Sequence, residues 1–218
     1  GVDGTMTEVH IRPYRLTDAA DLTSICIDTA DSGRGARGRL TDDEILPYIY
    51  ALPYVSYAPS WSFVVDTGSH ISGYIVGVPD VASFVNWWRD HWVPVLRERF
   101  GGTELWPEGE RELLERGLNP DSMWSDLRRT YEAEFHIDLL SDVQGRGLGT
   151  QLLGRFTEAV TTRSHAHGIA IGVDADNSRA IGFYAKNGLE VLREDRGSDG
   201  AVSGYTMGIC LRGPSRSA

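Results

Sequence analysis

The spacing of apolar and polar residues divides the chain into short strands and amphipathic helices. Runs rich in β-branched and aromatic residues predict strands, and apolar residues three and four positions apart predict helices. Strands are predicted at residues 8–12, 62–66, 70–78, 132–140, 169–175, 190–196 and 203–211. Helices are predicted at 18–29, after 41–44, at 147–167, and from Asn177 or Ser178 to about Gly188. The order strand, helix, strand in residues 132–175 is a βαβ unit, whose two strands should run parallel.

Local signals predict where several of these elements begin and end. Thr17 is suited to cap the first helix, and Thr41 with Glu44 has the spacing of a capping box for the second. Gly168 is expected to end the helix 147–167 as a C′ residue. Gly73, inside a predicted strand, indicates a β-bulge.

Residues 79–130 form a tryptophan-rich stretch between the third and fourth predicted strands. Helical pieces are predicted at residues 85–99, 108–117 and 121–129. The stretch holds Trp87, Trp88, Trp92, Trp106 and Trp124. We expect it either to cover one side of a cleft or to form an interface, where tryptophan is common, and packing within the stretch is the default explanation.

Composition is typical of one globular domain, which we place at residues 6–212. Of the 218 residues, 41% are hydrophobic and 24% are charged, and no apolar run reaches the roughly 20 residues of a membrane helix. Gly1 to Thr5 precede Met6, which is the expected native start. Cys26 and Cys210 are expected to be reduced core thiols in a cytoplasmic protein.

The charge balance limits the partners. Asp and Glu number 31 against 21 Lys and Arg, a formal charge of -10, which argues against nucleic-acid and anionic-membrane partners. A cationic amine would suit this charge, although solubility explains it equally well. Cysteine and histidine lack the spacing of a zinc site, so no metal is expected.

A glycine-rich turn, Gln144 to Gly149, follows the strand 132–140 and opens a helix. A helix start offers unpaired N–H groups and the positive end of the helix dipole, and glycine lets an anion approach the backbone. The spacing is not that of a P-loop, and Thr150 stands where a dinucleotide fingerprint needs glycine. The turn is therefore interpreted as a phosphate cradle, with a tight connection that binds no ligand as the alternative.

Two blocks of residues resemble the GNAT superfamily of N-acetyltransferases. Gln144-x-x-Gly147-x-Gly149 is similar to the family's Gln/Arg-x-x-Gly-x-Gly/Ala signature, and residues 177–189 resemble its Asn-x-x-Ala-x-x-x-Tyr-x-x-x-Gly-Phe segment, with Leu189 in place of Phe. The start of the chain, residues 11–13 followed by Asp18, is like the family's first strand and helix.

A narrower resemblance links residues 87–97 to an insertion in the acetyltransferase-like C-terminal domain of O-GlcNAcases and in free-standing bacterial relatives. Residues 136–140 also suit that subgroup, some of whose members have lost acetyl-CoA binding. The glycines, Asn177 and Tyr184 are kept here, which favours a protein that binds the cofactor.

The resemblance implies the acyl-CoA N-acyltransferase fold, an α/β (α+β mixed sheet) architecture with a helical insertion at residues 79–130. In this family the fourth and fifth strands part, and the pantetheine arm of coenzyme A pairs with the free edge of the fourth strand. The implied cofactor contacts are the backbone of Ile137, Leu139 and Leu140, the turn Gln144, Gly145, Arg146, Gly147, Leu148, Gly149 and Thr150, and the side chains of Asn177 and Tyr184.

The implied reaction is direct attack of a primary amine on the thioester of acetyl-CoA. A backbone N–H near Leu139 would stabilise the developing oxyanion, and Tyr184 would protonate the departing thiolate, unless Tyr184 is simply a core residue. The family often places a base where this chain has Ala133 and Phe135, neither of which can accept a proton. Asp138, Asp174 and a chain of water molecules remain the candidates for the base.

We therefore expect an acetyl-CoA-dependent N-acetyltransferase with a small-molecule amine acceptor. The alternatives are an inactive acetyltransferase-like binding module and an interaction protein that uses the tryptophan-rich stretch. A homodimer is one expected state of assembly.

Overall fold

The computed structural model describes residues 8–212. The strands are β1 (His10–Pro13), β2 (Phe63–Asp66), β3 (Ile71–Val78), β4 (Glu134–Leu139), β5 (Gly168–Asp174), β6 (Glu190–Arg196) and β7 (Val202–Cys210). The helices are α1 (Ala19–Thr29), α2 (Ile45–Tyr50), α3 (Leu52–Tyr57), α4 (Val81–Trp87), α5 (Val93–Phe100), α6 (Glu108–Leu118), α7 (Leu148–Arg163) and α8 (Ser178–Lys186). No helix in this part of the chain is long and apolar enough to cross a membrane.

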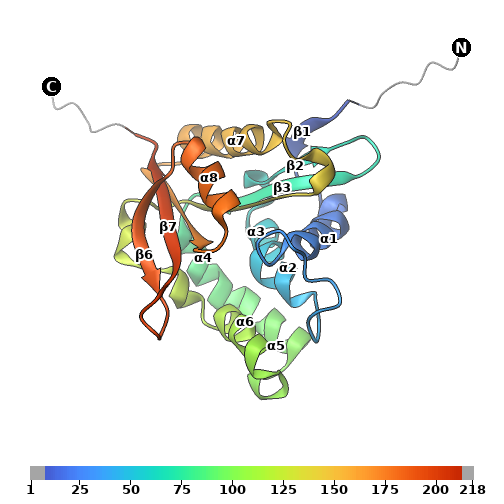
Figure 1. Ribbon diagram of the computed structural model, residues 1–218, viewed down its shortest axis with the longest axis vertical. Helices are drawn as coiled ribbons and strands as arrows, with labels where there is room; N and C mark the ends of the chain where they lie inside the picture. Colours follow the sequence, from blue (N-terminus) through green and yellow to red (C-terminus); the bar gives the residue numbers. More distant parts are fainter. Residues whose placement is uncertain (1–7, 213–218) are drawn as a thin grey trace, which may run out of the picture.

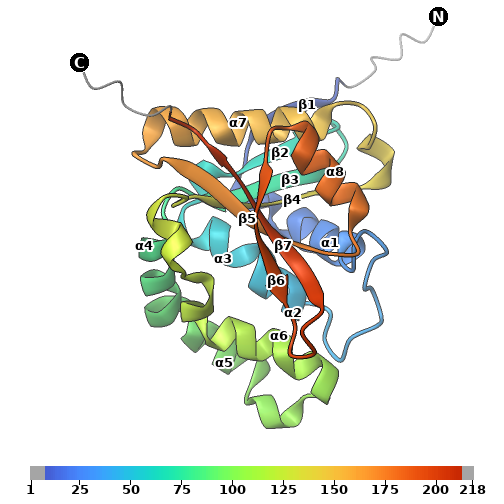
Figure 2. The ribbon, with the colours of Figure 1, turned by 60° about the vertical axis from the view of Figure 1, so that its left-hand side comes forward.

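The strands form two antiparallel sheets that meet at one point. One sheet has the order β1-β2-β3-β4 and the other β5-β7-β6. Ala133, just before β4, forms a parallel bridge with Ile169 of β5. The predicted parallel relation of the fourth and fifth strands is therefore confirmed at this bridge, beyond which the strands belong to separate sheets. Figure 2 shows β5 and β7 crossing in front of the first sheet.

Helices cover the two faces of the first sheet, and alternate residues of each strand face opposite ways. α7 lies along one face, with α1, α2 and α3 on the other and α4, α5 and α6 beyond them (Figure 1). Val64 and Tyr74 pack with the α1–α3 side, whereas Val65 and Ile75 pack with α7. This period of two is what the alternating sequence pattern predicts. The apolar positions of α7 are buried, as predicted: Leu148, Leu152, Leu153, Phe156 and Val160.

Residues 79–130, here called the helical segment, join β3 to β4. α4 and α5 are linked through one π-helical turn, Trp88–Trp92, and α6 follows. The indole N–H groups of Trp88, Trp92 and Trp106 donate to backbone carbonyls at 2.7, 2.8 and 3.1 Å. These three tryptophans are buried, so packing accounts for them, as the default explanation held.

Three predicted helix signals are wrong. Thr17 lies inside a single turn, Leu16–Asp18, where the Asp18 carboxylate accepts the N–H of Arg15 instead. Thr41 does not cap α2, because its amide and hydroxyl donate to Glu110 at 2.9 and 2.5 Å. α7 ends at Arg163, and Gly168 begins β5.

The bulge in β3 and the burial of the two cysteines differ in outcome: the first prediction is confirmed and the second is wrong in part. The bulge indicated by Gly73 is confirmed: Val65 pairs with Gly73 but Asp66 pairs with Ile71, which leaves Ser72 as the extra residue. Cys210 is exposed on β7, so the prediction of a second core thiol is wrong, whereas Cys26 is buried in α1.

Candidate active site

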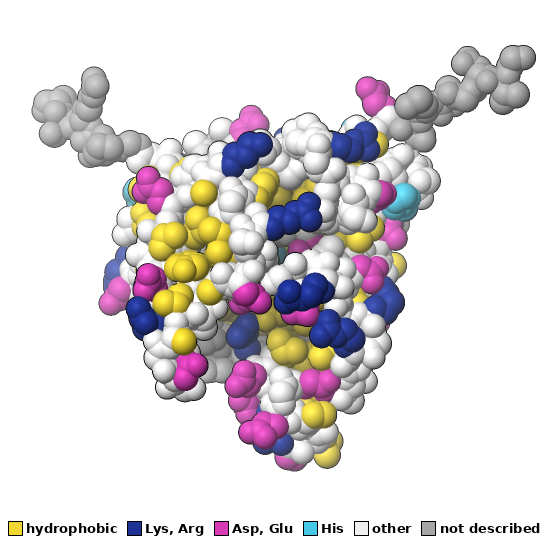
Figure 3. Space-filling view, viewed as in Figure 1, with side chains coloured by type: hydrophobic (Ala, Val, Ile, Leu, Met, Phe, Trp, Pro, Cys, Tyr) yellow, Lys and Arg dark blue, Asp and Glu magenta, His cyan; other side chains and the backbone are white. Residues whose placement is uncertain are grey.

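A cleft of about 1810 Å³ opens where β4 and β5 part. Its walls come from α1, the loop after α1, α2, α6, the glycine turn and α8. Figure 3 shows basic and acidic side chains gathered round the middle of this face, where the surface is hollowed. The cleft thus lies where the sequence places both the cofactor and the acceptor.

Hydrogen bonds at the two ends of β4 show which backbone groups face the gap. The N–H of Leu140 donates to Ser72 of β3 at 2.8 Å, and that of Ala133 donates to Gly168 at 3.1 Å on the opposite side. Successive residues of a strand direct their backbone N–H and C=O groups to opposite neighbours. Ile137 and Leu139 therefore share the direction of Ala133, and their backbone groups face the gap. The prediction of free backbone groups at Leu140 is wrong, since its carbonyl also accepts a bond from Val143.

The glycine turn presents a row of unpaired amides. Within residues 8–212, no acceptor bonds the N–H groups of Gly145, Arg146, Gly147, Leu148, Gly149 and Thr150. Gly145 and Gly147 have φ values of +73° and +75°, a conformation that glycine adopts without strain. α7 begins at Leu148, so the positive end of its dipole points at the same place. This cluster of donors fits the diphosphate of coenzyme A.

Gly149 serves packing rather than conformation. A Cβ atom added there would lie 3.1 Å from Cε2 of Phe183 and 3.6 Å from a methyl carbon of Leu139. The absence of a side chain here therefore lets Phe183 of α8 pack closely against the start of α7. This packing keeps the second motif beside the first.

Gln144 and Arg179 link the two motifs in a way that the sequence did not predict. Gln144 donates to the carbonyl of Leu139 at 2.9 Å and accepts a hydrogen bond from the Arg179 guanidinium. Both residues line the cleft. Arg179 is therefore the cation next to the amide cluster, whereas Arg146 is exposed and does not line the cleft. The signal for Arg179 was its place two residues after Asn177.

α8 carries the two predicted side chains of the second motif. Asn177 is the N-cap, since its side chain accepts the N–H of Ala180 at 3.1 Å, and it also borders the cleft. Tyr184 lines the cleft beside Phe135, with ring centroids 5.9 Å apart. Burial, with a smaller contribution from Asp138, raises the pKa of Tyr184, so its hydroxyl stays protonated near neutral pH.

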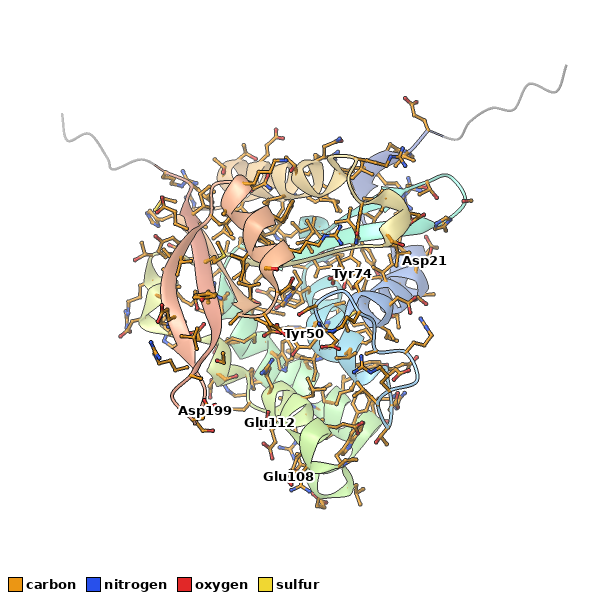
Figure 4. All side chains as sticks on the ribbon, viewed as in Figure 1. Asp21, Tyr50, Tyr74, Glu108, Glu112 and Asp199 are labelled. Atoms are coloured by element: carbon orange, nitrogen blue, oxygen red, sulfur yellow. The ribbon has the colours of Figure 1, made fainter. Side chains whose placement is uncertain are left out.

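Asp138 is a partly buried carboxylate on the α1 side of β4. Its Oδ2 accepts a hydrogen bond from the Tyr74 hydroxyl at 2.6 Å. Tyr74, labelled in Figure 4, lies on the neighbouring strand β3. Burial raises the pKa of Asp138 to about 6, despite the opposing hydrogen bond from Tyr74. A carboxyl with such a pKa can accept and release a proton near neutral pH.

Glu134 and His136 share that face of β4 and are joined through Tyr54 of α3. The Tyr54 hydroxyl donates to Oε1 of Glu134 and lies 2.9 Å from Nε2 of His136. Nη2 of Arg128 donates to Oε2 of Glu134 at 2.8 Å. Tyr50, labelled near the centre of Figure 4, packs edge-on against His136 with centroids 5.6 Å apart.

Sequence reasoning did not find the hydrogen bonds of Arg128 and Tyr54 because their partners lie far along the chain. Tyr54 and Glu134 are 80 positions apart. Arg128 occupies a stretch with no motif, yet it is buried and donates to the carbonyl oxygens of Ala133 and Ala170 at 3.1 and 2.9 Å. Asp174, the other predicted candidate base, lies exposed at the end of β5, on the edge of the cleft.

The sequence model of the acetyltransferase (GNAT) family matches residues 39–189. That range covers more than half of the chain and includes both motifs.

The chain belongs to the acetyltransferase (GNAT) family.

Membership confirms the predicted family, the predicted fold and the predicted class of enzyme, an N-acetyltransferase, and with them acetyl-CoA as the cofactor. The most informative structural likeness is to SsHAT, which is 30% identical with a TM-score of 0.84 over 94% of this chain and 100% of that one. The structure of yncA from Salmonella typhimurium with its cofactor acetyl-CoA has a TM-score of 0.57 over 95% of this chain and 96% of that one, and at 16% identity it shows the fold alone.

Two curated relatives carry the narrower resemblance. The O-GlcNAcase of Rattus norvegicus is 25% identical over 185 residues, 82% of this chain and 20% of that protein. The Mus musculus O-GlcNAcase is 24% identical over 189 residues, with the same coverage. The chain therefore spans about a fifth of the length of these relatives.

Proposed function

We propose that this GNAT protein transfers the acetyl group of acetyl-CoA directly to a small-molecule primary amine that enters the cleft from the side of α2 and α6. The observation that carries the proposal is the row of unpaired amides from Gly145 to Thr150, next to the free edge of β4. Such donors are costly to leave unpaired unless water or a ligand bonds them.

The cofactor-binding residues form two groups along the cleft. The amides of the turn, with Arg179 beside Gln144, would hold the phosphates by charge and by hydrogen bonds. Ile137 would pair with the extended arm through its backbone and Leu139 through its N–H, since the Leu139 carbonyl already accepts a bond from Gln144, and Asn177 would border the arm. The bound cofactor supplies the acetyl thioester that the acceptor attacks.

Three groups around the gap would act on the reacting atoms. The N–H of Leu139 would stabilise negative charge that develops on the acetyl oxygen. Tyr184, protonated near neutral pH, would donate its proton to the departing sulfur. Asp138, with a pKa of about 6, would take the proton that leaves the nitrogen as the amide forms. Asp174 is too exposed for us to prefer it.

The acceptor side of the cleft supports a small cationic amine. Tyr50, Leu113 and Arg116 line this side, and so do the carboxylates of Asp138 and Glu134. The formal charge of -10 attracts cations at long range. The inactive binding module is not favoured, because the chain retains both the amide cluster and Tyr184.

Isothermal titration of acetyl-CoA into the protein tests the cofactor assignment, and a screen of primary amines for release of free thiol tests the transfer. We expect micromolar binding and acetylation of at least one small amine. Absence of binding at high acetyl-CoA concentration would refute the proposal. Binding without thiol release from any amine would favour the inactive binding module.

A further inference from the structure

Acetyl transfer to a primary amine requires two proton removals, and the proposed function assigns only one of them. A primary amine such as that of lysine has a pKa of about 10.4, so near neutral pH it enters the cleft as an ammonium ion. One proton must leave before the nitrogen can attack, and a second leaves as the amide forms. Asp138 is assigned the second. The inference below rests on the proposed function and concerns the first proton.

His136 lies two residues before Asp138 and faces the same side of β4. About a third of its side chain, 34%, is exposed, and it lines the cleft. Tyr54, to which Nε2 is bonded, is buried with 1% of its surface exposed. One edge of the imidazole is therefore held inside the protein while the ring borders the acceptor side of the cleft.

The hydrogen bonds of Tyr54 determine which nitrogen of His136 carries a proton. A carboxylate only accepts hydrogen bonds, so the Tyr54 hydroxyl uses its single proton to donate a hydrogen bond to Glu134. The Tyr54 oxygen then offers only lone pairs to His136, and Nε2 must be the donor across the 2.9 Å contact. A neutral imidazole has one N–H, so Nδ1 keeps a free lone pair. No residue within 8–212 donates a hydrogen bond to Nδ1.

Burial keeps the resting imidazole of His136 neutral. Burial lowers its pKa, and the positive charges of Arg128 and Arg116 lower it further, whereas Glu134 opposes them. Tyr50 and Tyr54 pack edge-on against the ring and carry no charge near neutral pH, since burial raises both their pKa values. The resting ring is therefore neutral, and a proton gained at Nδ1 would give it a positive charge that faces Glu134 across Tyr54.

We propose that Nδ1 of His136 takes the first proton from the acceptor's ammonium group, and that Tyr54 and Glu134 are positioning residues that hold Nε2 protonated. An N–H bond of the ammonium breaks, its electron pair stays on nitrogen as the nucleophile, and a new N–H bond forms at Nδ1. Of the two protons that leave the nitrogen, one replaces the proton that Tyr184 gives to sulfur. The other passes from His136 to solvent.

Two amines of similar size separate this role from a structural one. Ethylamine is an ammonium ion near neutral pH, whereas trifluoroethylamine is largely neutral there and has no first proton to lose. His136→Gln keeps a donor for Tyr54 but removes the base. We expect it to lower kcat/KM for ethylamine by about 10²-fold and that for trifluoroethylamine by less than about threefold. Equal loss for both amines, or no loss for ethylamine, would overturn the proposal.

Nitrogen NMR of His136 provides a test that needs neither acetyl-CoA nor an acceptor. We expect the Nε2–H form with an unprotonated Nδ1 in the unmodified protein, and a mixture of the two forms in Tyr54→Phe. An Nδ1–H form in the unmodified protein would overturn the proposal even if acetyl transfer is found. Failure to bind acetyl-CoA, in contrast, would refute the proposed function and leave this NMR result unchanged.

Discussion

Ala133 and Ile169 form a parallel bridge at the point where β4 and β5 begin to part. Arg128 holds this point from within the helical segment, since its Nη1 donates to the carbonyl oxygens of Ala133 and Ala170 and its Nη2 to Glu134. The same guanidinium therefore joins the two sheets and anchors the carboxylate behind Tyr54. The buried guanidinium of Arg128 thus stabilises the point from which β4 and β5 part to form the cleft.

Arg128→Met should destabilise the protein by about 3–5 kcal/mol, because it leaves the Glu134 carboxylate buried without a partner. The side chains of Arg128 and Glu134 are 9% and 10% exposed, so water cannot replace the lost bonds. Denaturant unfolding followed by tryptophan fluorescence measures the change. Arg129→Met is the matched control, since its ion pair with Asp126 is on the surface, and a similar loss there would contradict the explanation.

Gly147→Glu should lower acetyl-CoA affinity by at least about tenfold. The substitution places a negative charge among the amides that face the phosphates, at a φ of +75° that disfavours side chains. Titration calorimetry measures the affinity. Gly109→Glu in α6, where an added side chain meets open space, adds the same charge away from the cleft and should bind normally. Unchanged affinity in Gly147→Glu would mean that the cradle is misassigned.

Tyr184→Phe should lower kcat by about 10²-fold while acetyl-CoA affinity changes by less than about threefold, because the hydroxyl acts on the departing sulfur rather than on binding. The ring and its contact with Phe135 stay in place. Steady-state kinetics and calorimetry on the same preparation separate the two effects. Parallel losses in turnover and affinity would instead assign Tyr184 to packing.

The pH dependence of turnover should follow Asp138, whose pKa is raised to about 6. Below that pH the carboxyl is protonated and cannot accept a proton, so kcat should fall about tenfold per pH unit. Asp138→Asn should lower kcat above pH ~6 and remove the part of this acid limb that Asp138 contributes, leaving the part due to His136. An unchanged pH profile in the variant would exclude Asp138 as the proton acceptor.

The same residue has a predicted effect on stability. Between its ordinary pKa of 3.8 and the folded value of about 6, the folded protein binds a proton at Asp138 that the unfolded chain does not. The contribution of Asp138 to the free energy of unfolding therefore falls as pH rises through this window. Comparing unfolding of the protein and Asp138→Asn across the window measures it, and a slope of opposite sign would contradict the assignment.

Most elements and the cofactor turn could be predicted because their signals are local. The period of Leu148, Leu152 and Phe156 reports a helix on a sheet, and the glycines at 145 and 147 report a turn with positive φ. The capping prediction at Thr17 failed because the neighbouring Asp18 accepts the N–H of Arg15 instead, and that at Thr41 failed because a polar side chain can bond a distant group rather than its own helix. Glu110, which bonds Thr41, lies 69 positions away.

The sequence alone determined the order of elements, the family and the cofactor motif, since each depends on residues close together in the chain. Which groups face the cleft depends on the tertiary structure. The outward backbone of Leu139, the bonded amide of Leu140 and the contact of Tyr54 with Glu134 and His136 depend on strand register and on burial. Such relationships join residues many positions apart, and burial changes the pKa of Asp138 in a way that no local pattern encodes.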